Sequence, residues 1–230
     1  MSNQLHIVLV HGAWGDASHW AKVIAALHAR GHEVSAVQLP LTSLLDDIHR
    51  TKQHLDGIDG PVLLVGHSYG GMVISGAGND AKVVGLVYIA AFAPDEGEAP
   101  GLLLARQEPP PGAAIIRPDE HGFLWLDKAQ FREHFCQDLD ETQALVMART
   151  QKPIAARCFE DAAGAPAWKS KPSWYQVSGQ DRMIPPDTQR WFAERMQARQ
   201  VLELDAGHAS LASQPEAVAT LIEGAARDVD

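Results

Sequence analysis

The run Gly66-His67-Ser68-Tyr69-Gly70-Gly71 constrains the fold of this chain more than any other stretch. It follows an apolar run at residues 61–65 and precedes residues 72–75, which are compatible with a helix. A serine flanked by glycines between a strand and a helix is the setting of a nucleophile elbow, because small neighbours let the two elements approach closely. The start of the helix directs free N–H groups at any anion that forms there. The run therefore predicts that Ser68 is a nucleophile.

Short apolar runs and helical patterns alternate on both sides of this turn. Runs at residues 5–10, 33–37, 61–65, 83–91, 173–178 and 201–204 predict strands. Helical periodicity predicts helices from residue 18, at 43–55, directly after the elbow, at 187–196 and from residue 215. The alternation predicts an α/β fold, with a mostly parallel sheet and helices on both of its faces.

The alternation breaks between residues 95 and 171. This stretch holds three consecutive prolines at 109–111 and two helical patterns, at 127–135 and from residue 140 to 147. We interpret residues 95–171 as an inserted, mostly helical cap over the carboxyl edge of the sheet, and residues 1–94 with 172–230 as the core. The aromatic residues of the insertion either form a small core of their own or face a pocket, and the sequence leaves both open.

Charge and cysteine content narrow the possible partners. The 230 residues carry a formal net charge of -10 without a cluster of Lys and Arg, so we expect neither nucleic acid nor a membrane as a partner. Cys136 and Cys158 have neither metal-binding nor redox spacing. No signal peptide is visible and no apolar run reaches membrane-spanning length. These features predict a cytoplasmic protein.

Three side chains suited to acyl transfer each follow a predicted strand: Ser68, Asp181 and His208. Because parallel strands end at the same edge of a sheet, we expect the three to meet there. His208 would take the proton of Ser68, and a buried Asp181 would fix the imidazole tautomer. Asp95 and Glu96 follow an earlier strand and are rival acids. We favour Asp181, since the rivals lie in a polar stretch that looks solvated.

Backbone and aromatic groups complete the predicted site. The N–H groups of Ala13 and Tyr69 are expected to form the oxyanion hole, with His11 supporting the first turn and His67 packing beneath the elbow. An apolar pocket is expected from five large side chains: Trp14, Phe123, Trp125, Met147 and Trp168.

Motifs for other chemistries fail on their context. Residues 76–81 match a loose G-x-G-x-x-A pattern, but they follow a helix rather than a strand. His32-Glu33 lacks the second histidine of a zinc-binding H-E-x-x-H motif, and there is no P-loop. We therefore expect no metal and no cofactor.

Four segments together resemble a group of small α/β-hydrolases that holds plant methylesterases, hydroxynitrile lyases and bacterial pyrethroid-hydrolase-like esterases. They are residues 9–14 (LVHGAW), 66–71 (GHSYGG), 179–186 (GQDRMIPP) and 207–208 (GH). The resemblance implies an α/β-hydrolase fold, the triad Ser68, Asp181 and His208, and oxyanion donors at Ala13 and Tyr69. The lyases typically carry Lys after the base and Thr in the oxyanion turn, where this chain has Ala209 and Gly12. Both departures disfavour lyase activity.

The residues and the resemblance lead to one functional prediction. We expect a serine hydrolase of the carboxylesterase type that cleaves an ester of an apolar or aromatic small molecule through an acyl-enzyme, without a cofactor. Lactones and thioesters would use the same groups. The alternatives are a small-molecule receptor on a hydrolase scaffold and hydroxynitrile lyase-type activity. The sequence indicates no oligomeric state.

Overall fold

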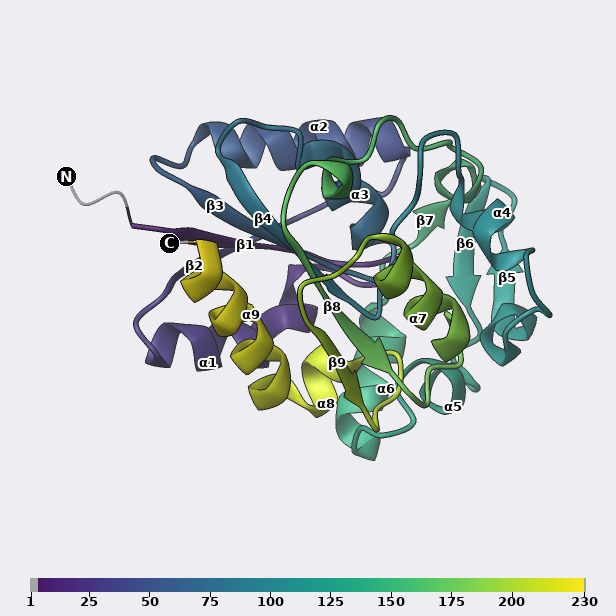
Figure 1. The fold of residues 1–230 in the computed structure, drawn as a ribbon. Coiled ribbons are helices and arrows are strands. Elements are labelled where there is room, and N and C mark those ends of the chain that lie inside the picture. The colour runs from purple at the N-terminus through teal and green to yellow at the C-terminus, as the bar shows by residue number, and fades with distance from the viewer. Residues whose placement is uncertain (1–3, 230) are drawn as a thin grey trace.

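The computed structural model describes residues 4–229 and contains a six-stranded sheet at its centre (Figure 1). The strand order is β2-β1-β3-β4-β8-β9, and every neighbouring pair is parallel. The strands are β1 (His6–Val10), β2 (Glu33–Val37), β3 (Val62–His67), β4 (Val83–Ile89), β8 (Ser173–Ser178) and β9 (Val201–Leu204). The predicted α/β fold with a mostly parallel sheet is confirmed.

Helices cover both faces of the sheet (Figure 1). One face carries α1 (Ala21–Ala29), α8 (Ser210–Ser213) and α9 (Pro215–Val229), and the other carries α2 (Leu44–Asp56), α3 (Gly70–Ala77) and α7 (Pro186–Arg195). Alternate residues of each strand point to opposite faces, so Leu64 joins the core beneath α2 and α3, whereas Leu63 and Val65 join the core beneath α1 and α9. Within residues 4–229, no helix combines the length and the apolar character needed to cross a membrane.

Capping side chains explain where two of these helices begin. The hydroxyl of Ser43 accepts a hydrogen bond from the N–H of Asp46, which starts α2 one residue after the serine. Asp16 caps the short 3-10 helix η1 (Ala17–Trp20) by accepting from the N–H of Ser18. The helix expected from residue 18 therefore consists of η1 followed by α1.

Residues 95–171, here called the inserted segment, leave the sheet after β4 and return at β8, which are neighbouring strands. Figure 1 shows most of this segment at one end of the sheet, while its last residues, drawn in green, run back past α3 to the start of β8. The two predicted helical patterns overlap α5 (Phe131–Phe135) and α6 (Glu141–Thr150), and α5 begins four residues later than its pattern. Its elements are α4 (Pro100–Leu104), η2 (Pro111–Ile115), β5 (Ile116–Pro118), β6 (Phe123–Leu126), α5 (Phe131–Phe135), α6 (Glu141–Thr150), β7 (Ile154–Ala155), η3 (Ala156–Phe159) and η4 (Ala167–Lys169).

The inserted segment also contains an antiparallel sheet, β5-β6-β7, which the sequence did not predict. These strands are only two to four residues long, so no alternation of apolar and polar residues can develop along them. The boundaries of a separate cap at residues 95 and 171 stay a prediction.

Candidate active site

Ser68 lies in a strained turn between β3 and α3. Its φ angle is 54°, in the left-handed region that few residues other than glycine adopt. The surrounding backbone holds this conformation: the N–H of Ser68 donates to the carbonyl of Ile89 at 3.2 Å, and its carbonyl accepts from Gly71 at 3.0 Å. A Cβ atom at Gly70 would lie 2.6 Å from the carbonyl oxygen of Val10, so only glycine lets β1 pass this close to the turn.

Ser68, His208 and Asp181 form a continuous chain of hydrogen bonds. The Oγ of Ser68 lies 2.9 Å from Nε2 of His208, and Nδ1 of His208 lies 2.7 Å from Oδ2 of Asp181. A carboxylate only accepts, so Nδ1 carries the proton and Nε2 is left to accept from the serine hydroxyl. All three side chains are buried. This is the arrangement that general-base activation of a serine requires.

The carboxylate of Asp181 is fixed by donors other than the histidine. Its Oδ1 accepts the N–H groups of Met183 at 2.7 Å and Ile184 at 3.0 Å. Its Oδ2 also accepts from Nε2 of Gln189 at 2.8 Å, and Gln189 is itself held by the N–H of Ser178. Asp181 thus has a single orientation, in which one oxygen faces His208.

The rival acids lie in other environments. Asp95 pairs with the ammonium group of Lys169, and the hydrogen bond from Lys169 is the main cause that lowers the pKa of Asp95. Glu96 is exposed. Among residues 4–229, Asp181 is the one carboxylate that is hydrogen-bonded to His208.

Two rings contact His208. The Nε2–H of His67 donates to the backbone carbonyl of His208 at 2.8 Å, and the two imidazole centroids are 4.8 Å apart. Burial holds the pKa of His67 well below its usual value, so this imidazole is neutral and does not compete for the proton of Ser68. Phe135 of α5 meets the ring of His208 edge-on, with 5.0 Å between centroids. The inserted segment therefore touches the predicted base.

The two predicted oxyanion donors are Ala13 and Tyr69, which line one pocket with Ser68. In the part of the chain that the structure describes, neither backbone N–H donates to a protein acceptor, so both are free to bind an oxyanion. The peptide that carries the Ala13 N–H is fixed from its other side. The Nδ1–H of His11 donates to the carbonyl of Gly12 at 2.9 Å, and Nε2 of His11 accepts from the N–H of Leu39 at 3.0 Å.

The side chain of Tyr69 is anchored below the elbow by a buried carboxylate. Its hydroxyl donates to Oδ2 of Asp47 at 2.8 Å, while Oδ1 of Asp47 accepts from the N–H of Leu41, also at 2.8 Å. Burial raises the pKa of Asp47 to about 6, against the opposing effect of these two hydrogen bonds. The phenol end of Tyr69 is therefore fixed beneath the elbow.

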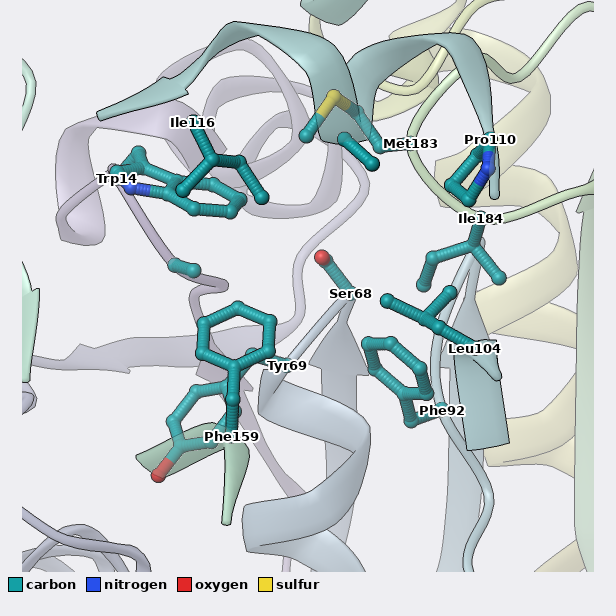
Figure 2. A pocket seen from close by; sticks show the side chains of 12 residues that line it. Trp14, Ser68, Tyr69, Phe92, Leu104, Pro110, Ile116, Phe159, Met183 and Ile184 are labelled. Carbon is teal, nitrogen blue, oxygen red and sulfur yellow. The ribbon is translucent and has the colours of Figure 1, made fainter. Parts of the chain in front are cut away.

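A largely apolar pocket opens above Ser68, with about 370 Å³ of space including its mouth. Figure 2 shows the hydroxyl of Ser68 pointing into this space from the floor. Among residues 4–229, no Lys or Arg side chain lines it. Its walls are Ala13, Trp14, Tyr69, Phe92, Leu104, Pro110, Ala113, Ile116, Phe159, Met183 and Ile184.

The predicted pocket residues are only partly brought together, which corrects the predicted set. Trp14 lines the pocket and faces Phe159, with 5.7 Å between ring centroids. Four others lie elsewhere: Phe123 on β6, Trp125 bonded through Nε1 to Asp119, Met147 in a separate groove between α6 and α1, and Trp168 bonded through Nε1 to the carbonyl of Pro94. The aromatic residues of 123–125 are partly buried within the small antiparallel sheet, outside the pocket.

Sequence position points to several of the walls that were not predicted. Met183 and Ile184 lie two and three residues after Asp181, and Phe92 follows β4 at the edge where the site lies. Leu104 and Phe159 carried no such signal, because only the path of the inserted segment brings them over Ser68. Within the described residues, no three His, Cys, Asp or Glu side chains are placed so as to hold a metal ion.

Comparison with known proteins extends over nearly the whole chain. A model described as "Alpha/beta hydrolase family" matches residues 7–221. Methylesterase 7 of Arabidopsis thaliana is 29% identical over an alignment of 249 residues, gaps included, which covers 96% of this chain and 96% of that protein. An alpha-hydroxynitrile lyase from the same plant is 25% identical over 256 residues and 99% of each. The crystal structure of the pyrethroid hydrolase PytH matches with a TM-score of 0.83 and 25% identity, over 98% of this chain and 99% of that one.

Proposed function

The chain belongs to the alpha/beta hydrolase family, and on that premise we propose that it is a serine esterase. Its esterase relatives support ester hydrolysis in general. The finer proposal is that it cleaves a carboxylic ester of an apolar or aromatic small molecule through an acyl-enzyme. The observation that carries this proposal is the hydrogen-bonded chain Ser68–His208–Asp181, whose serine hydroxyl points into an apolar pocket.

The proposed reaction begins when Nε2 of His208 removes the proton of Ser68 as Oγ attacks the ester carbonyl carbon. The N–H groups of Ala13 and Tyr69 bind the oxygen that becomes negative. The imidazolium, stabilised by Asp181, then gives its proton to the departing alcohol as the C–O bond breaks. A water molecule, activated by the same histidine, attacks the acyl-enzyme. This second attack releases the carboxylic acid and restores Ser68.

The pocket supports the proposed choice of substrate. Its side chains are aliphatic or aromatic apart from Ser68 and the phenol of Tyr69, and that phenol is engaged by Asp47. A substrate group bound there loses water without gaining polar partners, which favours an uncharged hydrocarbon or aromatic moiety.

The decisive experiment is multiple-turnover release of p-nitrophenol from short and aromatic acyl esters. We expect turnover by the wild-type protein, none by Ser68→Ala, and an unchanged fold of the variant by circular dichroism. An organophosphonate should add its mass to the peptide containing Ser68 and to no other. Activity that survives in Ser68→Ala would remove the serine from the mechanism. Saturable binding of the esters without any turnover would instead favour the receptor alternative.

The lyase alternative needs a positive charge beside the departing cyanide. The residue after His208 is the buried Ala209, and the pocket lining described above contains no Lys or Arg. We therefore expect no enzyme-dependent release of cyanide from mandelonitrile in weakly acidic buffer. Release above the uncatalysed background that disappears in Ser68→Ala would reinstate the lyase reading.

A further inference from the structure

The predicted acid and base lie on two neighbouring loops at the carboxyl edge of the sheet. One loop, residues 179–184, follows β8 and carries Asp181, and the other, residues 205–208, follows β9 and ends at His208. The loops are joined to each other by backbone hydrogen bonds, from the N–H of Gly179 to Leu204 at 2.8 Å and from that of Gln180 to Ala206 at 2.9 Å. Gly207, next to the base, takes no part in this pairing.

Two consecutive residues of the inserted segment reach both loops. The side-chain amide of Gln137 donates through Nε2 to the carbonyl of Gln180 at 2.7 Å, one residue before Asp181. The carboxylate of Asp138 accepts through Oδ2 the N–H of Gly207 at 2.8 Å, one residue before His208. These two side chains therefore span the acid loop and the base loop from outside.

Gly207 has no side chain, and this leaves room for Gln137 and Asp138 to pack against its backbone. A Cβ atom there would lie 2.6 Å from Oε1 of Gln137 and 2.8 Å from Oδ1 of Asp138, closer than real Cβ contacts come. Both side chains therefore pack directly on the backbone that precedes the base. Phe135, two residues earlier on the same segment, packs edge-on against His208.

We propose that Gln137 and Asp138 are positioning residues, which align His208 with Ser68 and Asp181. They do so by clamping the backbone immediately before Asp181 and immediately before His208. The proposal rests on the proposed esterase function, and it makes the location of the inserted segment a condition for activation of the serine. Without the clamp, Gly207 regains the broad backbone freedom of glycine, and His208 samples positions in which Nε2 is too far from Oγ. A displacement of about 1 Å can cost up to about 10²-fold in rate.

The test compares Asp138→Ala with Asp138→Asn. The alanine loses the acceptor for the Gly207 N–H, whereas the asparagine keeps a carbonyl oxygen there and loses only the charge. We expect Asp138→Ala to lower kcat roughly 10- to 100-fold with little change in KM, because the pocket walls do not move. Phosphonylation of Ser68, which also needs the base, should slow in parallel. Asp138→Asn should stay near the wild-type rate.

Glu133→Gln is the matched control. Glu133 lies on α5, five residues before Asp138, and contacts the acid loop through an exposed ion pair with Arg182 at 3.3 Å, but it does not touch the backbone next to either triad residue. We expect it to leave kcat unchanged. If Asp138→Ala does not fold, Gln137→Ala takes its place, with the same expectation of a lower kcat.

A spectroscopic measurement separates this proposal from the esterase proposal. The proton on Nδ1 of His208, bonded to Asp181, should give a far-downfield ¹H resonance in the wild-type protein whether or not any ester is turned over. We expect the resonance to broaden or vanish in Asp138→Ala and to persist in Asp138→Asn and Glu133→Gln. An unchanged resonance and unchanged kcat in Asp138→Ala would overturn the proposal. Equal losses in Asp138→Asn and Asp138→Ala would overturn it too, because charge rather than alignment would then be the cause.

Discussion

The Nδ1–H of His11 donates a hydrogen bond of 2.9 Å to the carbonyl oxygen of Gly12. The peptide bond between Gly12 and Ala13 is planar and trans, so a fixed carbonyl directs the Ala13 N–H to the opposite side. The imidazole is held in turn by the N–H of Leu39, and burial lowers its pKa to about 4. A neutral His11 with its proton on Nδ1 thus fixes one of the two proposed oxyanion donors.

The first prediction is that His11→Ala slows the chemical step. The peptide that carries the Ala13 N–H loses its restraint, and loss of one oxyanion donor costs at most about 10²–10³-fold. We expect kcat for p-nitrophenyl esters to fall about 10- to 100-fold while KM changes little. Thermal unfolding of the variant serves as the control, since a buried imidazole is removed. A folded variant with wild-type kcat would show that the turn needs no such support.

The second prediction separates the acids. Asp181→Asn keeps the shape of the side chain but favours the wrong imidazole tautomer, a change that has cost about 10⁴-fold in a protease triad. We expect a loss of at least ~10²-fold in kcat/KM. Asp95→Asn and Glu96→Gln should change the rate little, because Asp95 pairs with Lys169 and Glu96 is exposed. Near-normal rates in Asp181→Asn with collapse in one of the other two would reassign the acid.

The third prediction tests the walls of the pocket. Phe159 lines the pocket above Ser68 and packs beside Trp14, whereas Trp125 is bonded to Asp119 outside the pocket. We expect Phe159→Ala to change the ratio of kcat/KM between aromatic and acetyl esters by about 10-fold or more, since a hydrophobic contact is lost for only one of them. Trp125→Ala, the matched control, should leave that ratio unchanged. The opposite pattern would return the pocket to the residues first predicted.

The fourth prediction concerns pH and stability. The pKa of Asp47 is about 6 in the folded protein against 3.8 ordinarily, so the fold prefers the protonated carboxyl. Its contribution to stability is therefore favourable at low pH and is lost as the pH rises through about 6. Asp47→Asn cannot titrate. We expect the free energy of unfolding of the variant, relative to wild type, to increase by about 2 kcal/mol between pH ~4.5 and ~7.5.

Urea titrations of both proteins at several pH values measure this difference. Any constant effect of the substitution on the hydrogen bonds to Tyr69 and Leu41 cancels in the comparison. A difference that does not vary with pH would mean that Asp47 titrates normally.

The sequence predicted the fold and the site best where a local backbone requirement and a chemical requirement fall on the same residues. The turn at Ser68 needs glycines and a strand-helix junction, and the alternation of apolar runs predicted the sheet; the fold class and the family resemblance are confirmed. Asp181 and His208 each follow a strand of one parallel sheet, so their meeting with Ser68 could be anticipated from order alone. Their catalytic roles stay a proposal, as does the cytoplasmic location.

The pocket could not be predicted in the same way. Its walls depend on how the inserted segment folds over the sheet, and strands as short as β7 leave no periodic pattern in the sequence. Trp125 and Phe159 are both aromatic residues of that segment, yet only Phe159 lies above Ser68. Composition shows that aromatic side chains are present, but tertiary packing decides which of them face the site.

The inserted segment joins β4 to β8, two strands that lie side by side and are hydrogen-bonded in the sheet. Exchange for a segment of another length would therefore leave the strand register intact, which makes this junction a natural point for diversification and for engineering. Retained sheet geometry would not be sufficient for an active hybrid, however. A transplanted segment would also have to supply a hydrogen-bond donor for the carbonyl of Gln180 and an acceptor for the N–H of Gly207. New specificities would therefore arise most readily from segments that carry both groups.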